Sequence, residues 1–104
     1  MANFVLVYAG GSAGATEAER KKVMEAWGAW FGKLGDKVVD PGNPFATQAK
    51  TLSNGTAHDG AEGTPASGYS ILKADSLNTA AELAQGCPVL QSGGKITVYE
   101  VTPM

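Results

Sequence analysis

The sequence predicts an α+β domain with a split βαβ layout, in which an antiparallel sheet carries both helices on one face. Segments with strand-like composition flank two segments of helical periodicity, in the order strand, helix, three strands, helix, strand. With 104 residues and 43% apolar content, the chain suits one domain spanning residues 1–104, because each of two halves would be too small to bury a core.

Four strands are predicted from apolar and β-branched content. The first is a nearly continuous apolar run that ends at Gly10 and Gly11, which is typical of a strand buried on both faces. The last alternates Ile96 and Val98 with Thr97, Tyr99 and Val101. The four segments are residues 3–9, 37–40, 68–74 and 95–101.

The middle of the chain is less regular. Residues 45–52 alternate poorly, and we expect them to form an edge strand. Residues 53–68 are rich in Gly, Ser, Thr and Ala, which favours a loop or a hairpin with a mobile tip.

Both predicted helices carry recognisable start and end signals. Thr16 followed by Glu19 is a capping box, and Gly35 supplies the residue that ends the first helix. Its apolar stripe is Val23, Trp27, Trp30 and Leu34, broadened by Met24 and Phe31. The second helix begins after residues 75–76 and ends at Gly86, and we expect Pro88 to prevent its resumption.

Composition excludes several classes of function. The net charge of −2 lacks the basic excess of a nucleic-acid binder, and no apolar run approaches the length of a membrane span. One Cys and one His make a zinc site within one chain improbable, and we expect no cofactor. The first residues lack the basic region of a signal peptide, so a cytoplasmic location is expected.

The predicted sheet has apolar side chains on both faces. One face of such a sheet is covered by helices, and the other is polar when it meets water. An exposed apolar face marks an interface, so we expect a homodimer with two-fold symmetry. The alternative is that a long loop covers this face. The opposed sets are Phe4, Leu6 and Tyr8 against Val5, Val7 and Ala9, and Tyr69 and Ile71 against Leu72 and Ala74.

Five stretches together resemble the YCII-related (DGPF-type) domain of the dimeric α+β barrel superfamily. They are WGAWFGKLG at 27–35, VVDPGNP at 38–44, GYSILKADS at 68–76, AQGCPVL at 84–90 and GKITVYE at 94–100. The resemblance implies a ferredoxin-like fold and a homodimer with two sheets packed face to face. It implies little about activity, because most members have none assigned. A few resemble ring-cleaving or dehydrochlorinating enzymes of aromatic breakdown, and some accompany transcription factors.

The family's proposed acid–base pair is not preserved. The position of its helix histidine falls near Met24, and that of its aspartate falls near Cys87. The DGPF motif survives only as Asp59-Gly60, followed by Ala61-Glu62. These departures weaken the transfer of an enzymatic role to this chain.

Asp40 and His58 are the candidate catalytic residues. Asp40 ends a strand before a turn with two prolines, where a carboxylate can lie at the rim of a pocket or simply bond nearby backbone N–H groups. His58 is the side chain expected to titrate near neutral pH, and either Asp40 or Asp59 could orient it. Its loop also suits a solvated side chain.

Aromatic residues suggest a site for a flat organic ligand, although simple core packing is the readier explanation for them. We place this hypothetical pocket between the first helix and the sheet. Its candidate ligand-binding residues are Trp27, Trp30, Asn43, Tyr8 and Met24. The sequence therefore predicts a small-molecule-binding protein and, as one form of it, a cofactor-independent enzyme acting on a flat organic compound; the alternative is a non-catalytic dimerisation or regulatory module.

Overall fold

The computed structural model describes residues 1–12 and 14–103; Ala13 and Met104, which belong to the predicted domain, lie outside the described residues. The elements in chain order are β1 (Ala2–Ala9), α1 (Glu17–Leu34), the 3₁₀ turn η1 (Gly35–Lys37), β2 (Val38–Asp40), β3 (Lys50–Ser53), β4 (Thr56–Asp59), β5 (Ala66–Ala74), α2 (Leu77–Ala84), α3 (Pro88–Gln91) and β6 (Lys95–Val101).

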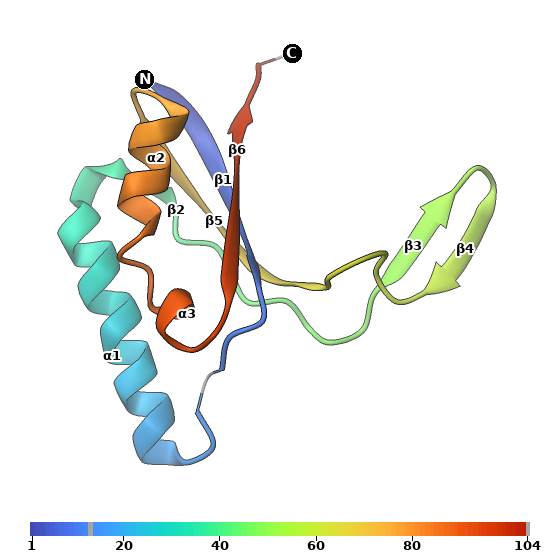
Figure 1. The fold of residues 1–104 in the computed structure, drawn as a ribbon, viewed down its shortest axis with the longest axis horizontal. Coiled ribbons are helices and arrows are strands. Elements are labelled where there is room, and N and C mark those ends of the chain that lie inside the picture. Colours follow the sequence, from blue (N-terminus) through green and yellow to red (C-terminus); the bar gives the residue numbers. More distant parts are fainter. Residues whose placement is uncertain (13, 104) are drawn as a thin grey trace.

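The main sheet has the strand order β2-β5-β1-β6, and every neighbouring pair is antiparallel. All three helices lie on one side of it, and the opposite face carries none of them (Figure 1). This confirms the predicted α+β architecture with an antiparallel sheet and helices on one face. Strands β5 and β1 are the two inner strands of the sheet. Phe4, Leu6 and Tyr8 of β1 are buried, whereas Val5 and Val7 on its other face are only partly buried.

The first helix begins and ends where the sequence predicts. The hydroxyl of Thr16 accepts a hydrogen bond from the backbone N–H of Glu19 at 3.1 Å. The Glu19 carboxylate in turn accepts one from the N–H of Ala15 at 2.8 Å. Gly35 follows the helix with φ of +59°, which a side chain would disfavour.

Residues 45–52 do not form an edge strand of the main sheet, so that prediction was wrong. Only Lys50–Ser53 is a strand, and it pairs with β4 in a separate two-stranded hairpin. The hairpin turn is Asn54-Gly55, with φ of +48° and +85°, a pairing that favours tight two-residue turns. The exposed polar residues before β3 have no apolar face to bury, so the chain leaves the sheet instead.

A third, short helix was not predicted: α2 ends at Ala84 and does not resume, but Pro88 begins the separate helix α3. Pro88 occupies the first turn of α3, where its missing N–H costs nothing and its fixed φ suits a helix.

The core lies between the helices and one face of the sheet. Leu6 and Leu72 are fully buried there in one cluster with Trp30 and Leu34 of α1, and Phe4 is fully buried in a second cluster with Ala74 and Ala80. Ile96 and Val98 of β6 pack against it from the sheet, as their alternation predicts.

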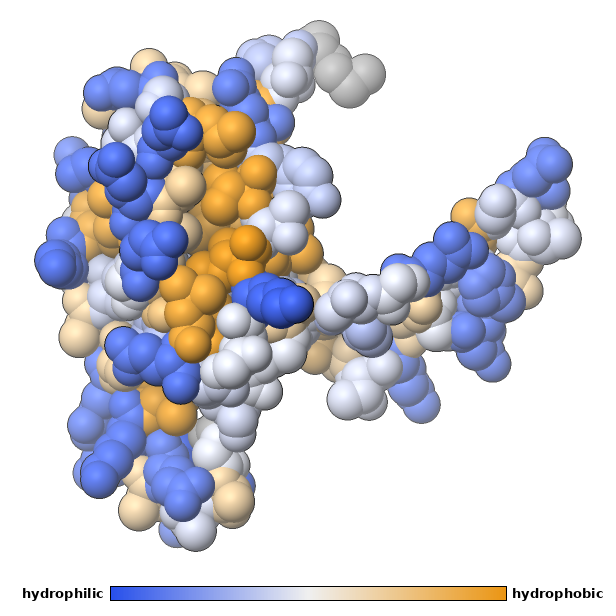
Figure 2. Space-filling model, in the orientation of Figure 1, coloured by the Kyte–Doolittle hydropathy of each residue, from blue (hydrophilic) through white to orange (hydrophobic). Residues whose placement is uncertain are grey.

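Residues 46–65, called the arm below, extend away from the body on the side of the helix-free face (Figure 1). The radius of gyration is 14.9 Å, whereas a compact domain of this length has about 13 Å. Figure 2 shows an open notch between the arm and the body. The arm is therefore not packed into the domain.

Candidate functional site

The helix-free face of the sheet is largely apolar, and it is called the bare face below. Val39, Tyr99 and Val101 are among the exposed large apolar side chains of the described residues, and the others are partly buried. Its apolar residues are Val5, Val7, Val39, Tyr69, Ile71, Tyr99 and Val101, and the register places the polar residues Asn3, Lys73 and Thr97 on the same face.

Asp40 turns toward the bare face because β2 is irregular. The register shifts between Val38 and Asp40, so that Val38 pairs with Leu72 but Asp40 pairs with Ile71. Directly paired residues share a face, and Ile71 belongs to the bare face. One carboxylate oxygen of Asp40 accepts a hydrogen bond from the Tyr69 hydroxyl at 3.3 Å.

The turn after Asp40 is held tightly against β5. The other carboxylate oxygen of Asp40 accepts a hydrogen bond from the N–H of Gly42 at 2.8 Å, which closes the turn. Gly42 has φ of +75°, and a Cβ built on it would lie 1.7 Å from the carbonyl oxygen of Tyr69. Only glycine fits at this position, so Gly42 allows the turn after Asp40 to lie directly against β5.

An aromatic pair extends the same site. The rings of Phe45 and Tyr69 are stacked, with centroids 5.8 Å apart and an angle of 23° between their planes. Asn43 contributes its backbone carbonyl, which accepts from the N–H of Tyr69 at 3.3 Å. Asp40, Tyr69 and Phe45 thus place a carboxylate, a hydroxyl and an aromatic surface together at the rim of the bare face.

The two tryptophans lie on the other side of the sheet. Trp27 contacts Tyr8 edge-on, with centroids 5.2 Å apart, and it also meets Trp30 and Phe31. The Trp30 indole donates to the carbonyl of Leu83 at 3.2 Å. These contacts fill the interface between α1 and the sheet, so the aromatic side chains are part of the core cluster.

The structure therefore separates the residues that the sequence grouped into one pocket. Asp40 and Asn43 lie beside Tyr69, whereas Trp27, Trp30 and Tyr8 pack under α1. Met24 is 71% exposed on the outside of α1.

Ser70 is a buried polar residue that the sequence analysis missed. Its hydroxyl accepts a hydrogen bond from the Tyr8 hydroxyl and donates one to the carbonyl of Pro41, both at 2.7 Å. The chain of hydrogen bonds links β1 and β5 to the turn that carries Asp40. One sequence signal was available, because Ser70 lies in an apolar strand at a position that alternation assigns to the core.

Burial perturbs two titratable groups beside this chain. Removal from water raises the pKa of the Tyr8 hydroxyl well above its ordinary value, although the bond to Ser70 acts in the opposite direction. Burial also raises the pKa of the Cys87 thiol. Both groups are therefore held in their neutral forms, and Cys87 is not an activated nucleophile.

His58 lies on the arm rather than beside Asp40. It belongs to β4, its side chain is 51% exposed, and its Nε2 is 3.7 Å from a carboxylate oxygen of Glu62. Within one chain, the structure does not bring the two candidate catalytic residues together (Figure 1).

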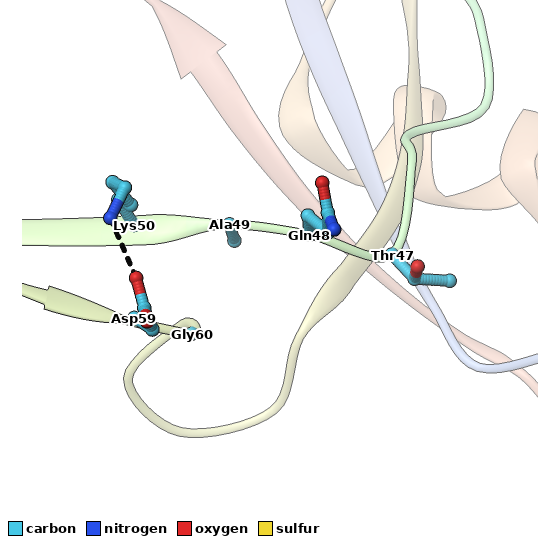
Figure 3. A pocket seen from close by; sticks show the side chains of 6 residues that line it. All are labelled: Thr47, Gln48, Ala49, Lys50, Asp59 and Gly60. Atoms are coloured by element: carbon cyan, nitrogen blue, oxygen red, sulfur yellow. Dashed lines mark hydrogen bonds and ion pairs between the residues drawn. The ribbon is translucent and has the colours of Figure 1, made fainter.

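Two hollows stand out on the surface, and neither is lined by Asp40 or His58. One is an open hollow of about 600 Å³ at the base of the arm, beside the 2.6 Å ion pair between Lys50 and Asp59 (Figure 3). The other, of about 150 Å³, is lined by residues of α2, β6 and the segment between them. Its lining is mainly apolar and consists of Ala81, Ala84, Gln85, Leu90, Ile96 and Val98.

Neither a membrane span nor a metal cluster is found in the part of the chain that the structure describes. Within residues 1–12 and 14–103, no helix is long and apolar enough to cross a membrane. The same residues contain no group of three or more His, Cys, Asp or Glu side chains placed to hold a metal ion.

Comparison with known families identifies the domain. A sequence model of the YCII-related domain matches residues 4–104, which is nearly the whole chain. The chain belongs to the YCII-related domain family. The resemblance inferred from the sequence is thereby confirmed.

A solved structure supports the fold of this YCII-related domain. It is 5-chloro-2-hydroxyhydroquinone dehydrochlorinase (TftG) from Burkholderia phenoliruptrix AC1100, in complex with 2,5-dihydroxybenzoquinone. The TM-score is 0.56 at 17% sequence identity, and the match covers 97% of this chain and 95% of the other. No curated protein sequence matches this chain. At this identity the likeness establishes the shared fold and leaves the activity to be argued from the site.

Proposed function

We propose that this YCII-related domain is a small-molecule-binding protein that acts as a homodimer, with its ligand site at the rim of the bare face. The observation that carries the proposal is the cluster of Asp40, Tyr69 and Phe45. It combines a stacking surface for a flat ring with a carboxylate that can accept a hydrogen bond or a proton. A flat organic compound with a hydroxyl group suits both.

The chemistry available to this cluster needs no cofactor. The Asp40 carboxylate has one oxygen committed to the turn through Gly42, while its other oxygen makes the longer bond to Tyr69. A ligand hydroxyl can compete for that second oxygen, and the Tyr69 hydroxyl would then be free to bond the ligand as well. The dehydrochlorinase with the same fold binds a quinone, which is consistent with a ligand of this class.

The homodimer follows from the bare face. Val39, Tyr99 and Val101 are each about half exposed, and covering such a side chain contributes about 1 kcal/mol. Two copies would thus gain about 6 kcal/mol from these residues, and association itself costs about 4–15 kcal/mol. The exposed apolar side chains favour pairing, and a stable dimer needs further contacts.

The alternative function is a non-catalytic dimerisation or regulatory module. The filled interface between α1 and the sheet favours it, because the pocket expected there is occupied by Trp27 and Trp30. The replacement of the family's acid–base positions by Met24 and Cys87 favours it too. The two functions share the dimer and differ in whether Asp40 contacts a ligand.

Native mass spectrometry of the purified protein tests stoichiometry and any retained metabolite together. A thermal-shift titration with 2,5-dihydroxybenzoquinone as the probe then tests Asp40. We expect Asp40→Asn to abolish the stabilisation by the probe, while the matched variant Asp36→Asn, at an exposed position in η1, retains it. An equal shift in both variants would remove Asp40 from the site. A cytoplasmic location remains a prediction of the sequence.

A further inference from the structure

We propose that the arm of each subunit crosses to a second copy of this chain and packs against it, so that the two subunits clasp each other. This rests on the homodimer proposed above. The partner is a second copy because the arm extends from the body on the same side as the bare face (Figure 1). Under two-fold symmetry, a copy that covers the bare face is also placed beside the arm.

The arm needs a surface to pack on. A two-stranded hairpin alone is marginally stable in water. Every residue of β4 is exposed, and in β3 only Thr51 is partly buried. Leu52, near the tip, is 75% exposed, which leaves most of a large apolar side chain in water. A hairpin of this kind is expected to be ordered by another molecule.

The bare face alone is small for a stable interface. The four strands of the sheet have 8, 3, 9 and 7 residues, and at a spacing of about 4.8 Å and a rise of about 3.3 Å per residue they cover roughly 430 Å². Stable interfaces bury about 800 Å² on each partner. The arm is the further surface available on the same side of the molecule, and its contacts would add to those of the sheet.

The register of the hairpin assigns its two faces. Leu52 pairs with Ala57 and Lys50 pairs with Asp59, so these residues share one face. Thr51 pairs with His58 on the opposite face. The apolar pair is the one that would lose water on docking, so the Leu52 face is the docking face. Because His58 belongs to the arm, this docking would place it beside the second copy rather than beside Asp40 of its own chain.

Sedimentation velocity over a dilution series tests the arm with a matched pair of variants. We expect Leu52→Asp to raise the dissociation constant of the dimer by about tenfold or more, because it places a charge on the docking face. Thr51→Asp adds the same charge to the same strand on the opposite face, and we expect a much smaller change. Both positions are on the hairpin outside the core, so the fold of the body should not change.

Hydrogen exchange provides a second measurement that needs no variant. The amides of β3 and β4 should exchange slowly at concentrations where the wild-type protein is dimeric and rapidly after dilution to the monomer. If the wild-type protein sediments as a monomer at all concentrations, the proposed dimer and the proposed docking of the arm are both wrong. If the wild-type protein is a dimer whose dissociation constant Leu52→Asp leaves unchanged, only the proposal for the arm is wrong. The same holds if hydrogen exchange of the β3 and β4 amides does not depend on protein concentration.

Discussion

The hydrogen-bonded chain from Tyr8 through Ser70 to Pro41 predicts unequal effects for two single-atom changes. Tyr8→Phe removes one donor, and the Ser70 hydroxyl still donates to the Pro41 carbonyl. We expect a loss of about 1 kcal/mol in the free energy of unfolding. Ser70→Ala instead leaves the hydroxyl of Tyr8, a residue that is only 5% exposed, without its Ser70 acceptor. It also removes the bond to Pro41, so the expected loss is about 2–4 kcal/mol.

The double variant Tyr8→Phe/Ser70→Ala tests whether the unsatisfied Tyr8 hydroxyl causes the larger loss, because a simple count of lost hydrogen bonds would make the two losses additive. With Tyr8→Phe already present, Ser70→Ala no longer leaves a buried hydroxyl without an acceptor. The combined loss should therefore be smaller than the two single losses added together, by about 1 kcal/mol or more. A shift of this size corresponds to roughly 4 °C or more in the melting temperature of a domain of this length.

Urea unfolding followed by tryptophan fluorescence is the appropriate assay, because Trp27 and Trp30 lie in the core that melts. All variants should be compared at one protein concentration, since dimer formation adds to apparent stability. The reasoning would be refuted if Ser70→Ala cost no more than Tyr8→Phe, or if the two losses simply added.

Two further predictions concern alkaline pH and the turn at Gly42. Burial raises the pKa values of Cys87 and Tyr8 above their ordinary 9.0 and 10.0. The unfolded chain therefore loses these two protons at a lower pH than the folded chain does. The free energy of unfolding should fall as the pH rises above about 9, by up to about 1.4 kcal/mol per pH unit for each group. Urea unfolding from pH 7 to 11 should show a shallower decline for Tyr8→Phe, and an unchanged slope would count against the assignment. Gly42→Ala should lower the free energy of unfolding by about 3 kcal/mol or more, because it strains a residue at positive φ and displaces the turn from Tyr69. The control Gly63→Ala, at an exposed residue with positive φ and open space around it, should cost only the backbone strain. Equal losses in urea unfolding would contradict the close packing at Gly42.

The arm shows how local signals can be present and still be outweighed. Asn54-Gly55 is a strong hairpin signal between β3 and β4, yet the weak alternation before it led to a prediction of an edge strand. A local pattern specifies that two segments pair with each other. Whether the resulting hairpin joins a sheet depends on the rest of the molecule.

The sequence by itself determined the ends of α1, the two faces of β1 and the α+β class. These depend on interactions between residues close in the chain, such as Thr16 with Glu19, and on the period of apolar residues. The tertiary structure decided the site. The register shift in β2 turned Asp40 toward Tyr69, and helix packing placed Trp27 on the opposite side of the sheet. The placement of Asp40 depends on pairing between distant strands, which no local pattern encodes.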